Sequence, residues 1–138
     1  MKIIDITRPL SENILIYPGD SAPVFRQADH GRYLLTDLHL STHTGTHIDA
    51  PAHYLKTGDT IDTISLSHIM GTCRVLDVTH TGTRITMNHL MGRLDGIERL
   101  LLKTSFSGTD QFNEDYPCLT ADAASFITGC NMKCVGID

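Results

Sequence analysis

The sequence predicts an α/β or α+β fold: a compact, β-rich single domain with a mixed sheet and flanking helices. In the first half of the chain, short β-branched and apolar runs are separated by Pro- and Gly-containing turns. In the second half, strand-like runs alternate with helix-like segments. No repeat or linker interrupts the 138 residues, so residues 1–138 are predicted to form one domain.

Strands are predicted where β-branched or alternating apolar residues run between turn signals. The turn Pro18-Gly19-Asp20 closes the second strand, and Asp20 is expected to cap that turn. In the third strand, four alternate residues share one face that we expect in the sheet core: Leu34, Thr36, Leu38 and Leu40. The predicted strands span residues 2–6, 13–17, 33–42, 72–78, 97–103 and 133–137.

Two helices are predicted from their capping signals. Thr86 can cap a short helix that runs to about Arg93. Thr120 can cap a longer helix, with Asp122 complementing the helix dipole in the first turn and Gly129 as the C-cap.

Composition excludes several classes of partner. The net charge is −5, and the 11 basic residues form no stripe of the kind that duplex binding requires, so nucleic acid is not expected. No apolar run approaches the ~20 residues of a membrane span, and the N-terminus lacks a signal-peptide stretch, which predicts a cytoplasmic protein. The four cysteines form no CxxC pair and are expected as buried thiols, with a structural zinc site as the alternative.

The histidines cluster. Four of the eight lie between residues 39 and 53. His43, His47, Asp49 and His53 occupy odd positions, so an extended chain would project them to one face. A straight strand would separate His43 from His47 by ~13 Å, too far for one metal ion. A bend is therefore required, and Gly45 can adopt the necessary backbone angles.

Two imidazoles and one carboxylate form a common metal-ligand set that leaves a position open for water. His53 is then available for proton transfer. The spacing of His43 and His47 also fits one face of a helix, but Gly45 and the surrounding β-branched threonines oppose a helix here. Histidines packed for purely structural reasons, with no metal, remain an alternative.

The string HTGTHIDAPAH, residues 43–53, resembles the signature of the cyclase-like metal-dependent hydrolases, which include bacterial kynurenine formamidases and isatin hydrolases. Weaker resemblances cover essentially the rest of the chain: Ile4 to Ser11, Tyr17 to Asp20, Leu101 to Thr104 and Cys134 to Asp138.

The resemblance implies that His43, His47 and Asp49 bind a divalent metal, zinc first and manganese as the alternative, with Asp49 bridging two ions in two-metal members. It assigns proton transfer to His53. It further implies a compact β-rich α/β domain, a homo-oligomer, and hydrolysis of a C–N amide bond in a small-molecule substrate. N-formylkynurenine, an intermediate of tryptophan catabolism, is the first candidate for an arylformamidase-like enzyme.

One departure from the family concerns length. Its members typically continue past the strand matched by residues 133–138 and supply a further His and Glu to a second metal. The expectation is therefore a C-terminally truncated domain with weak or absent activity alone. The alternative function is a non-catalytic remnant that keeps a metal-binding or oligomer-interaction role.

Overall fold

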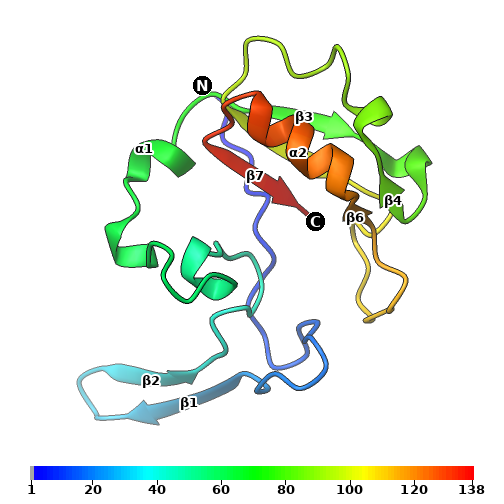
Figure 1. Ribbon diagram of the computed structural model, residues 1–138. Helices are drawn as coiled ribbons and strands as arrows, with labels where there is room; N and C mark the ends of the chain where they lie inside the picture. Colours follow the sequence, from blue (N-terminus) through cyan, green and yellow to red (C-terminus); the bar gives the residue numbers. More distant parts are fainter. Residues whose placement is uncertain (1) are drawn as a thin grey trace. The chain divides into compact units, whose positions relative to one another are not determined.

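The computed structural model of the chain describes residues 2–138 (Figure 1). Its contacts divide the chain into two compact units. The first unit runs to Asp62 and includes Asp110–Phe112, and the second contains Thr63–Thr109 and Asn113–Asp138. Each unit is described by itself below, and the prediction of one domain over residues 1–138 stays a prediction.

A parallel three-stranded sheet forms the centre of the second unit. Its strands lie in the order β3 (Arg74–Asp77), β5 (Arg99–Lys103), β7 (Cys134–Ile137). The central strand β5 has a neighbouring strand on each side and carries three consecutive leucines, Leu100 to Leu102. Such an apolar run is typical of a parallel strand that has little contact with water. A second parallel pair joins β4 (Arg84–Ile85) to β6 (Cys118–Leu119).

The core of this unit lies between the sheet and helix α2 (Ala121–Gly129), which precedes β7 (Figure 1). Ala123 and Ile127 are four residues apart, so they share the helix face that packs against the strands. The buried hydrophobic residues of this core are Leu76, Val78, Ile85, Leu90, Leu94, Leu100, Leu102, Ala123 and Ile127.

Helix α2 begins at its predicted cap but ends differently. Thr120 is the N-cap residue, yet its hydroxyl donates to the carbonyl of Ile85. Hydrogen bonds from the Thr120 side chain and the Met87 backbone N–H lower the pKa of Asp122. The helix continues through Gly129, so the predicted C-cap is wrong. Cys130 is the C-cap, and Asn131 adopts the left-handed conformation (φ 54°) after it.

Short helical turns fill the connections: η2 (Ile61–Thr63), α1 (Leu66–Ile69), η3 (Thr79–Thr81) and η4 (Met87–His89). The helix predicted from Thr86 to Arg93 is only the 3₁₀ turn η4, although Thr86 does form a capping box with His89. The buried Arg99 donates to the carbonyls of Ser67 and His68, which ties the end of α1 to β5.

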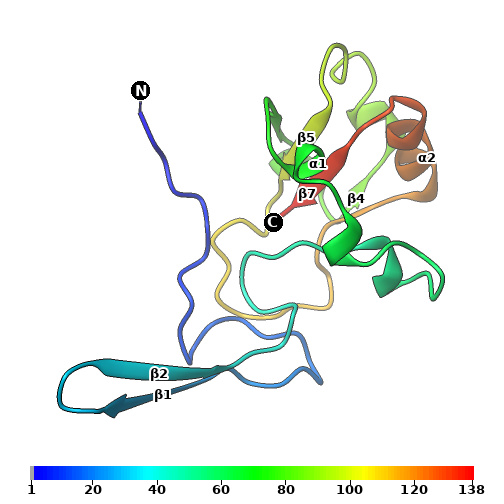
Figure 2. The same ribbon diagram turned by 90° about the vertical axis from the view of Figure 1, so that its left-hand side faces the viewer.

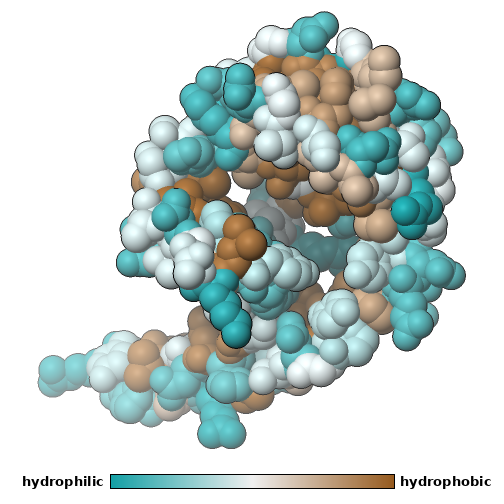
Figure 3. Space-filling view, in the orientation of Figure 1, coloured by the Kyte–Doolittle hydropathy of each residue, from teal (hydrophilic) through white to brown (hydrophobic). Residues whose placement is uncertain are grey.

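The first unit contains an antiparallel hairpin, β1 (Val24–Asp29) and β2 (Leu34–His39), whose strands lie side by side in Figure 2. Its register places Leu34, Thr36 and Leu38 on one face, as predicted. Their predicted burial is wrong, because Leu34 is 61% and Leu38 57% exposed. Figure 3 accordingly shows apolar surface on the hairpin.

Two predicted strands do not form. Residues 2–6 and 13–17 have no regular structure, although the turn that follows residue 17 is present. Strand β1 was not among the predicted strands, nor were the two-residue strands β4 and β6. The remaining predicted strands are confirmed with narrower bounds, as β2, β3, β5 and β7.

The cysteine prediction was partly wrong. Cys73 and Cys118 are exposed, whereas Cys130 is partly buried against the core. Within residues 2–138, no group with metal-binding geometry contains a cysteine.

None of the helices in the described part of the chain combines the length and apolar composition needed to cross a bilayer.

The core of the second unit yields a stability prediction. Leu100 on the central strand is fully buried, so Leu100→Ala should lower the free energy of unfolding by ~2–5 kcal/mol through lost contacts and a residual cavity. Val75 on the neighbouring strand β3 is 58% exposed. Val75→Ala should therefore change the free energy of unfolding by less than ~1 kcal/mol. Urea unfolding of both variants tests this; equal losses would contradict the assigned core.

Candidate metal centre

A sharp bend follows strand β2 and carries the candidate ligands. The Thr44 N–H donates to the Ser41 carbonyl (3.1 Å), and Gly45 then takes a positive φ of 67°. A Cβ atom on Gly45 would lie 3.0 Å from Leu10 Cδ2 and 3.1 Å from Ile14 Cδ1. Glycine is therefore required at this position for two reasons: the positive φ, and the close packing of the N-terminal segment against it.

The bend brings the three predicted ligands together. His43 Nδ1 lies 3.0 Å from Asp49 Oδ1, and His47 Nε2 lies 3.5 Å from the same oxygen. The two ring nitrogens are 3.2 Å apart. Donor atoms that each lie ~2.1 Å from one zinc ion are roughly 3.0–3.4 Å from one another. The three separations therefore fit donors that share a single cation.

The hydrogen bonding of His47 supports the same arrangement. Its Nδ1 lies 2.8 Å from the Gly45 carbonyl oxygen, which can only accept, so Nδ1 carries the proton. In the neutral ring, the lone pair then lies on Nε2, the atom that faces His43 and Asp49. A lone pair directed at a carboxylate is repulsive without a cation or proton between them. A histidine that binds a metal through one ring nitrogen usually donates a hydrogen bond from the other nitrogen to a carbonyl or carboxylate, which fixes the orientation of the ring.

His53 lies beside this trio. It ends the 3₁₀ turn η1 (Pro51–His53), in which Pro51 occupies a first-turn position. Its ring centroid is 4.3 Å from that of His43. One donor atom each from His43, Asp49 and His53 lie within 4.8 Å of one another. His53 therefore belongs, with His43 and Asp49, to a second set of donor atoms that could hold a metal ion. The assignment of each role stays a prediction.

Asp20 supports His43 in a way that the sequence did not reveal. Pro18 and Gly19 (φ 98°) form a turn closed by a hydrogen bond from the Asp20 N–H to the Tyr17 carbonyl. The Asp20 carboxylate accepts from the Ser41 hydroxyl (3.2 Å), and the Ser41 oxygen accepts from the His43 N–H (3.2 Å). The turn role expected for Asp20 is thus accompanied by a link to the backbone of a candidate ligand.

Comparison with known proteins identifies the family. The Cyclase family model matches residues 4–138. The chain belongs to the cyclase family.

Kynurenine formamidases are among its relatives in this family. The chain is 35% identical over 140 residues to that of Bacillus cereus, covering 98% of this chain and 67% of the relative. It is 33% identical over 142 residues to that of Bacillus anthracis, covering 99% and 68%. The chain therefore spans about two thirds of the length of these relatives.

Solved structures confirm the α/β fold class. One is described as a potential metal-dependent hydrolase with cyclase activity, with a TM-score of 0.83 and 32% identity over 99% of this chain and 67% of that one. Another is a predicted metal-dependent hydrolase from Bacillus stearothermophilus, with a TM-score of 0.81 and 33% identity over 99% and 68%.

Among residues 2–138 of this cyclase-family chain, no group with metal-binding geometry contains a histidine from outside residues 43–53. His39 is the last residue of β2, and His30 stacks on Tyr33 in the hairpin turn. His89 accepts the Thr86 N–H at Nδ1 in the capping box, so its role there is structural.

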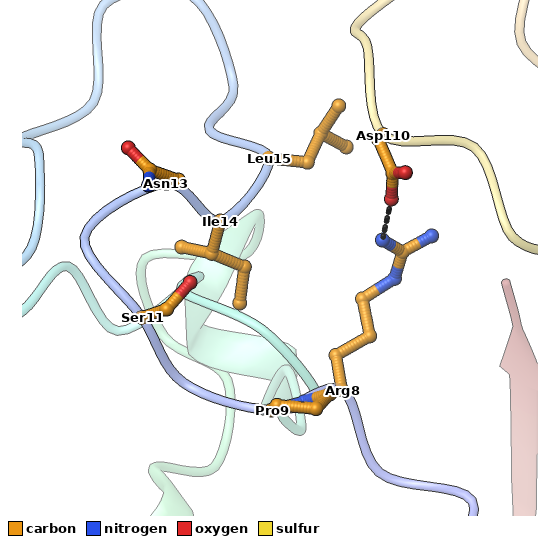
Figure 4. Close-up of a pocket in the computed structure, with 7 residues that line it drawn as sticks. All are labelled: Arg8, Pro9, Ser11, Asn13, Ile14, Leu15 and Asp110. Atoms are coloured by element: carbon orange, nitrogen blue, oxygen red, sulfur yellow. Dashed lines mark ion pairs between the residues drawn. The ribbon is translucent and has the colours of Figure 1, made fainter.

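A pocket of about 230 Å³ lies in the same unit as the candidate ligands. Figure 4 shows the Arg8 side chain extending to Asp110, with a 4.0 Å ion pair between them. The remaining lining residues come from the N-terminal segment: Pro9, Ser11, Asn13, Ile14 and Leu15.

The ligand assignment predicts the effect of one substitution. His47→Ala should abolish stoichiometric binding of zinc while leaving the fold largely intact, because the ring is partly exposed and packs in no core. His30→Ala removes a histidine from the hairpin turn and should leave metal content unchanged. Elemental analysis and circular dichroism measure both effects. Full metal stoichiometry in His47→Ala would make the assignment wrong.

Proposed function

We propose that this cyclase-family chain is a metal-dependent hydrolase of a C–N amide bond with arylformamidase-like activity. The observation that carries the proposal is the convergence of His43 Nδ1, His47 Nε2 and Asp49 Oδ1 within 3.0–3.5 Å of one another. Its similarity to kynurenine formamidases, at 35% identity to the Bacillus cereus protein, supports N-formylkynurenine as the first substrate to test.

In this proposal, His43, His47 and Asp49 hold a divalent cation, zinc first and manganese as the alternative. Such an ion supplies hydroxide near neutral pH and polarises a carbonyl group. The chain's own residues do the rest. The Gly45 carbonyl keeps His47 in the tautomer whose Nε2 can bind a cation. The link through Ser41 to Asp20 holds the backbone of His43.

His53 is proposed to pass a proton to the leaving nitrogen of the amide. Its place next to His43, at the end of the short turn η1, supports this role. A Cβ atom on Gly58 would lie 2.9 Å from the carbonyl carbon of Pro51, so close backbone packing holds η1 in place. The proposed site of action is the cytoplasm.

The test of this function is turnover of N-formylkynurenine by metal-loaded protein, compared with His53→Ala. The variant should lose ~10²-fold or more in turnover, the scale of general acid–base help. Its metal content should be unchanged, because the proposal assigns the ion to His43, His47 and Asp49 and proton transfer to His53. Loss of metal from His53→Ala would make His53 a ligand instead.

The alternative proposal is a metal-binding or interaction role without catalysis. Full metal occupancy with no turnover of small aryl or cyclic amides would favour it over the hydrolase. Absence of metal binding would favour histidines packed for structural reasons.

We also propose that the chain works as a homo-oligomer. The face of the hairpin that carries Leu34 and Leu38 is exposed, and apolar surface of this kind is a common site of self-association. The 15.2 kDa chain is then expected to scatter light as a dimer or larger assembly. The double change Leu34→Glu and Leu38→Glu should lower the mass, whereas Leu35→Glu on the opposite face should lower it less. A monomer at all concentrations would contradict the proposal.

A further inference from the structure

Tyr54 follows directly after His53 and is held by the same turn. It is the C-cap residue of η1, and its backbone N–H donates to the Pro51 carbonyl (3.2 Å). The N–H of the next residue, Leu55, donates to the same carbonyl (2.9 Å). With the close packing of Gly58 against Pro51, these bonds fix the backbone from which the Tyr54 side chain projects. The position of the Tyr54 ring is therefore tied to that of His53.

The side chains of these two neighbours are in contact. The ring centroids of His53 and Tyr54 are 4.5 Å apart, and the ring planes are inclined by 75°, which is an edge-to-face arrangement. The His53 ring also contacts the ring of the candidate ligand His43, at 4.3 Å between centroids. One imidazole thus connects Tyr54 to the candidate metal centre.

Most of the Tyr54 surface remains accessible. The residue is 85% exposed, so its contact with His53 covers only a small part of the ring. Exposure of a single aromatic residue is ordinary on a protein surface. The distinguishing feature of Tyr54 is its place, because the accessible ring lies against the side chain that is proposed to protonate the leaving nitrogen.

That proton transfer restricts where the leaving group lies. A ring nitrogen of His53 must come within ~2.6–3.2 Å of the amide nitrogen to pass a proton to it. In an N-aryl amide, the aromatic ring is bonded directly to this same nitrogen. The substrate ring therefore lies beside His53, where Tyr54 is the adjoining aromatic residue. Aromatic rings pair favourably at centroid separations of ~4.5–7 Å, which a ring in this place can meet.

The same geometry distinguishes related amides from one another. A saturated ring on the leaving nitrogen would occupy the same space, but it lacks the charge distribution that makes edge-to-face and offset-stacked aromatic pairs favourable. A ring on the acyl side is separated from the leaving nitrogen by the carbonyl carbon. Tyr54 is therefore placed to favour an aromatic ring on the nitrogen over both alternatives.

We propose that Tyr54 is a specificity-determining residue, which recognises an aromatic ring on the leaving nitrogen of the amide by pairing with it. The inference rests on the proposed function, and it assigns to a residue outside the candidate ligands the choice between aryl and saturated leaving groups.

The test compares two neutral amide analogues that differ only in the ring on the nitrogen. The zinc-loaded full chain is titrated calorimetrically with phenylurea and with cyclohexylurea, both of which resist hydrolysis. The wild-type protein should bind phenylurea more tightly. Tyr54→Leu keeps an apolar side chain without the ring, so it should lower the ratio of the two affinities about fivefold, the scale of one aromatic pair. Tyr54→Phe keeps the ring and should leave this ratio within about twofold of the wild-type value.

Tyr33→Leu is the matched control. Tyr33 is also an exposed tyrosine beside a histidine, with its ring stacked on His30 at 5.0 Å in the hairpin turn. Its loss should leave the affinity ratio unchanged. The proposal would be overturned by an unchanged ratio in Tyr54→Leu, by the same loss in Tyr33→Leu or Tyr54→Phe, or by a wild-type protein without preference for phenylurea.

Steady-state kinetics separate recognition by Tyr54 from an effect transmitted through His53. In Tyr54→Leu, the KM for formanilide should rise, whereas the kcat for formanilide and both constants for N-cyclohexylformamide should stay unchanged. An equal fall in kcat for both substrates would mean that Tyr54 only positions His53, and would remove the specificity role.

The two sets of measurements also distinguish failure of this inference from failure of the proposed function. A lowered urea ratio in Tyr54→Leu, in a protein that hydrolyses neither formamide, keeps ring recognition by Tyr54 and removes the hydrolase. Hydrolysis of formanilide with both the urea ratio and the KM insensitive to Tyr54→Leu keeps the hydrolase and removes the role of Tyr54.

Discussion

The backbone reversal at Gly45 is the constraint on which the candidate metal centre depends. Any side chain at this position would meet Leu10 and Ile14 and would also have to adopt a positive φ. Without the reversal, His43 and His47 would stay far apart along an extended chain. With it, Asp49 Oδ1 contacts both rings, and the Gly45 carbonyl itself fixes the proton of His47. One residue thus sets the direction of the chain and the tautomer of a candidate ligand.

The irregular N-terminal segment acts as the support for this reversal. The Arg8 N–H donates to Thr46, Leu10 and Ile14 pack at Gly45, and the turn before Asp20 reaches His43 through Ser41. None of these contacts requires regular secondary structure in residues 8–20. Specific hydrogen bonds and close packing do the positioning that strands or helices perform in the second unit.

Predictions from the sequence were most accurate where a local pattern of residues is compatible with a single kind of structure. Strand β5 has three consecutive leucines at its centre, and the bend expected at Gly45 brings His43, His47 and Asp49 together. Predictions were poorer where the outcome depends on distant partners. Residues 2–6 are β-branched, but a strand needs a neighbouring edge to bond with, and none is paired with them in the described chain. Asp20 looks like an ordinary turn residue because Ser41, its partner, is 21 positions away.

All the candidate ligands lie within residues 43–53, and this locality has a thermodynamic consequence. The entropy lost on closing a loop grows only slowly with loop length, so ligands separated by two to four residues gather at small cost even in an unfolded chain. A cation can then bind the denatured ensemble as well as the native protein. Its contribution to the stability of the fold is the difference between those two affinities. Tight metal binding and a modest rise in melting temperature are therefore compatible in this molecule.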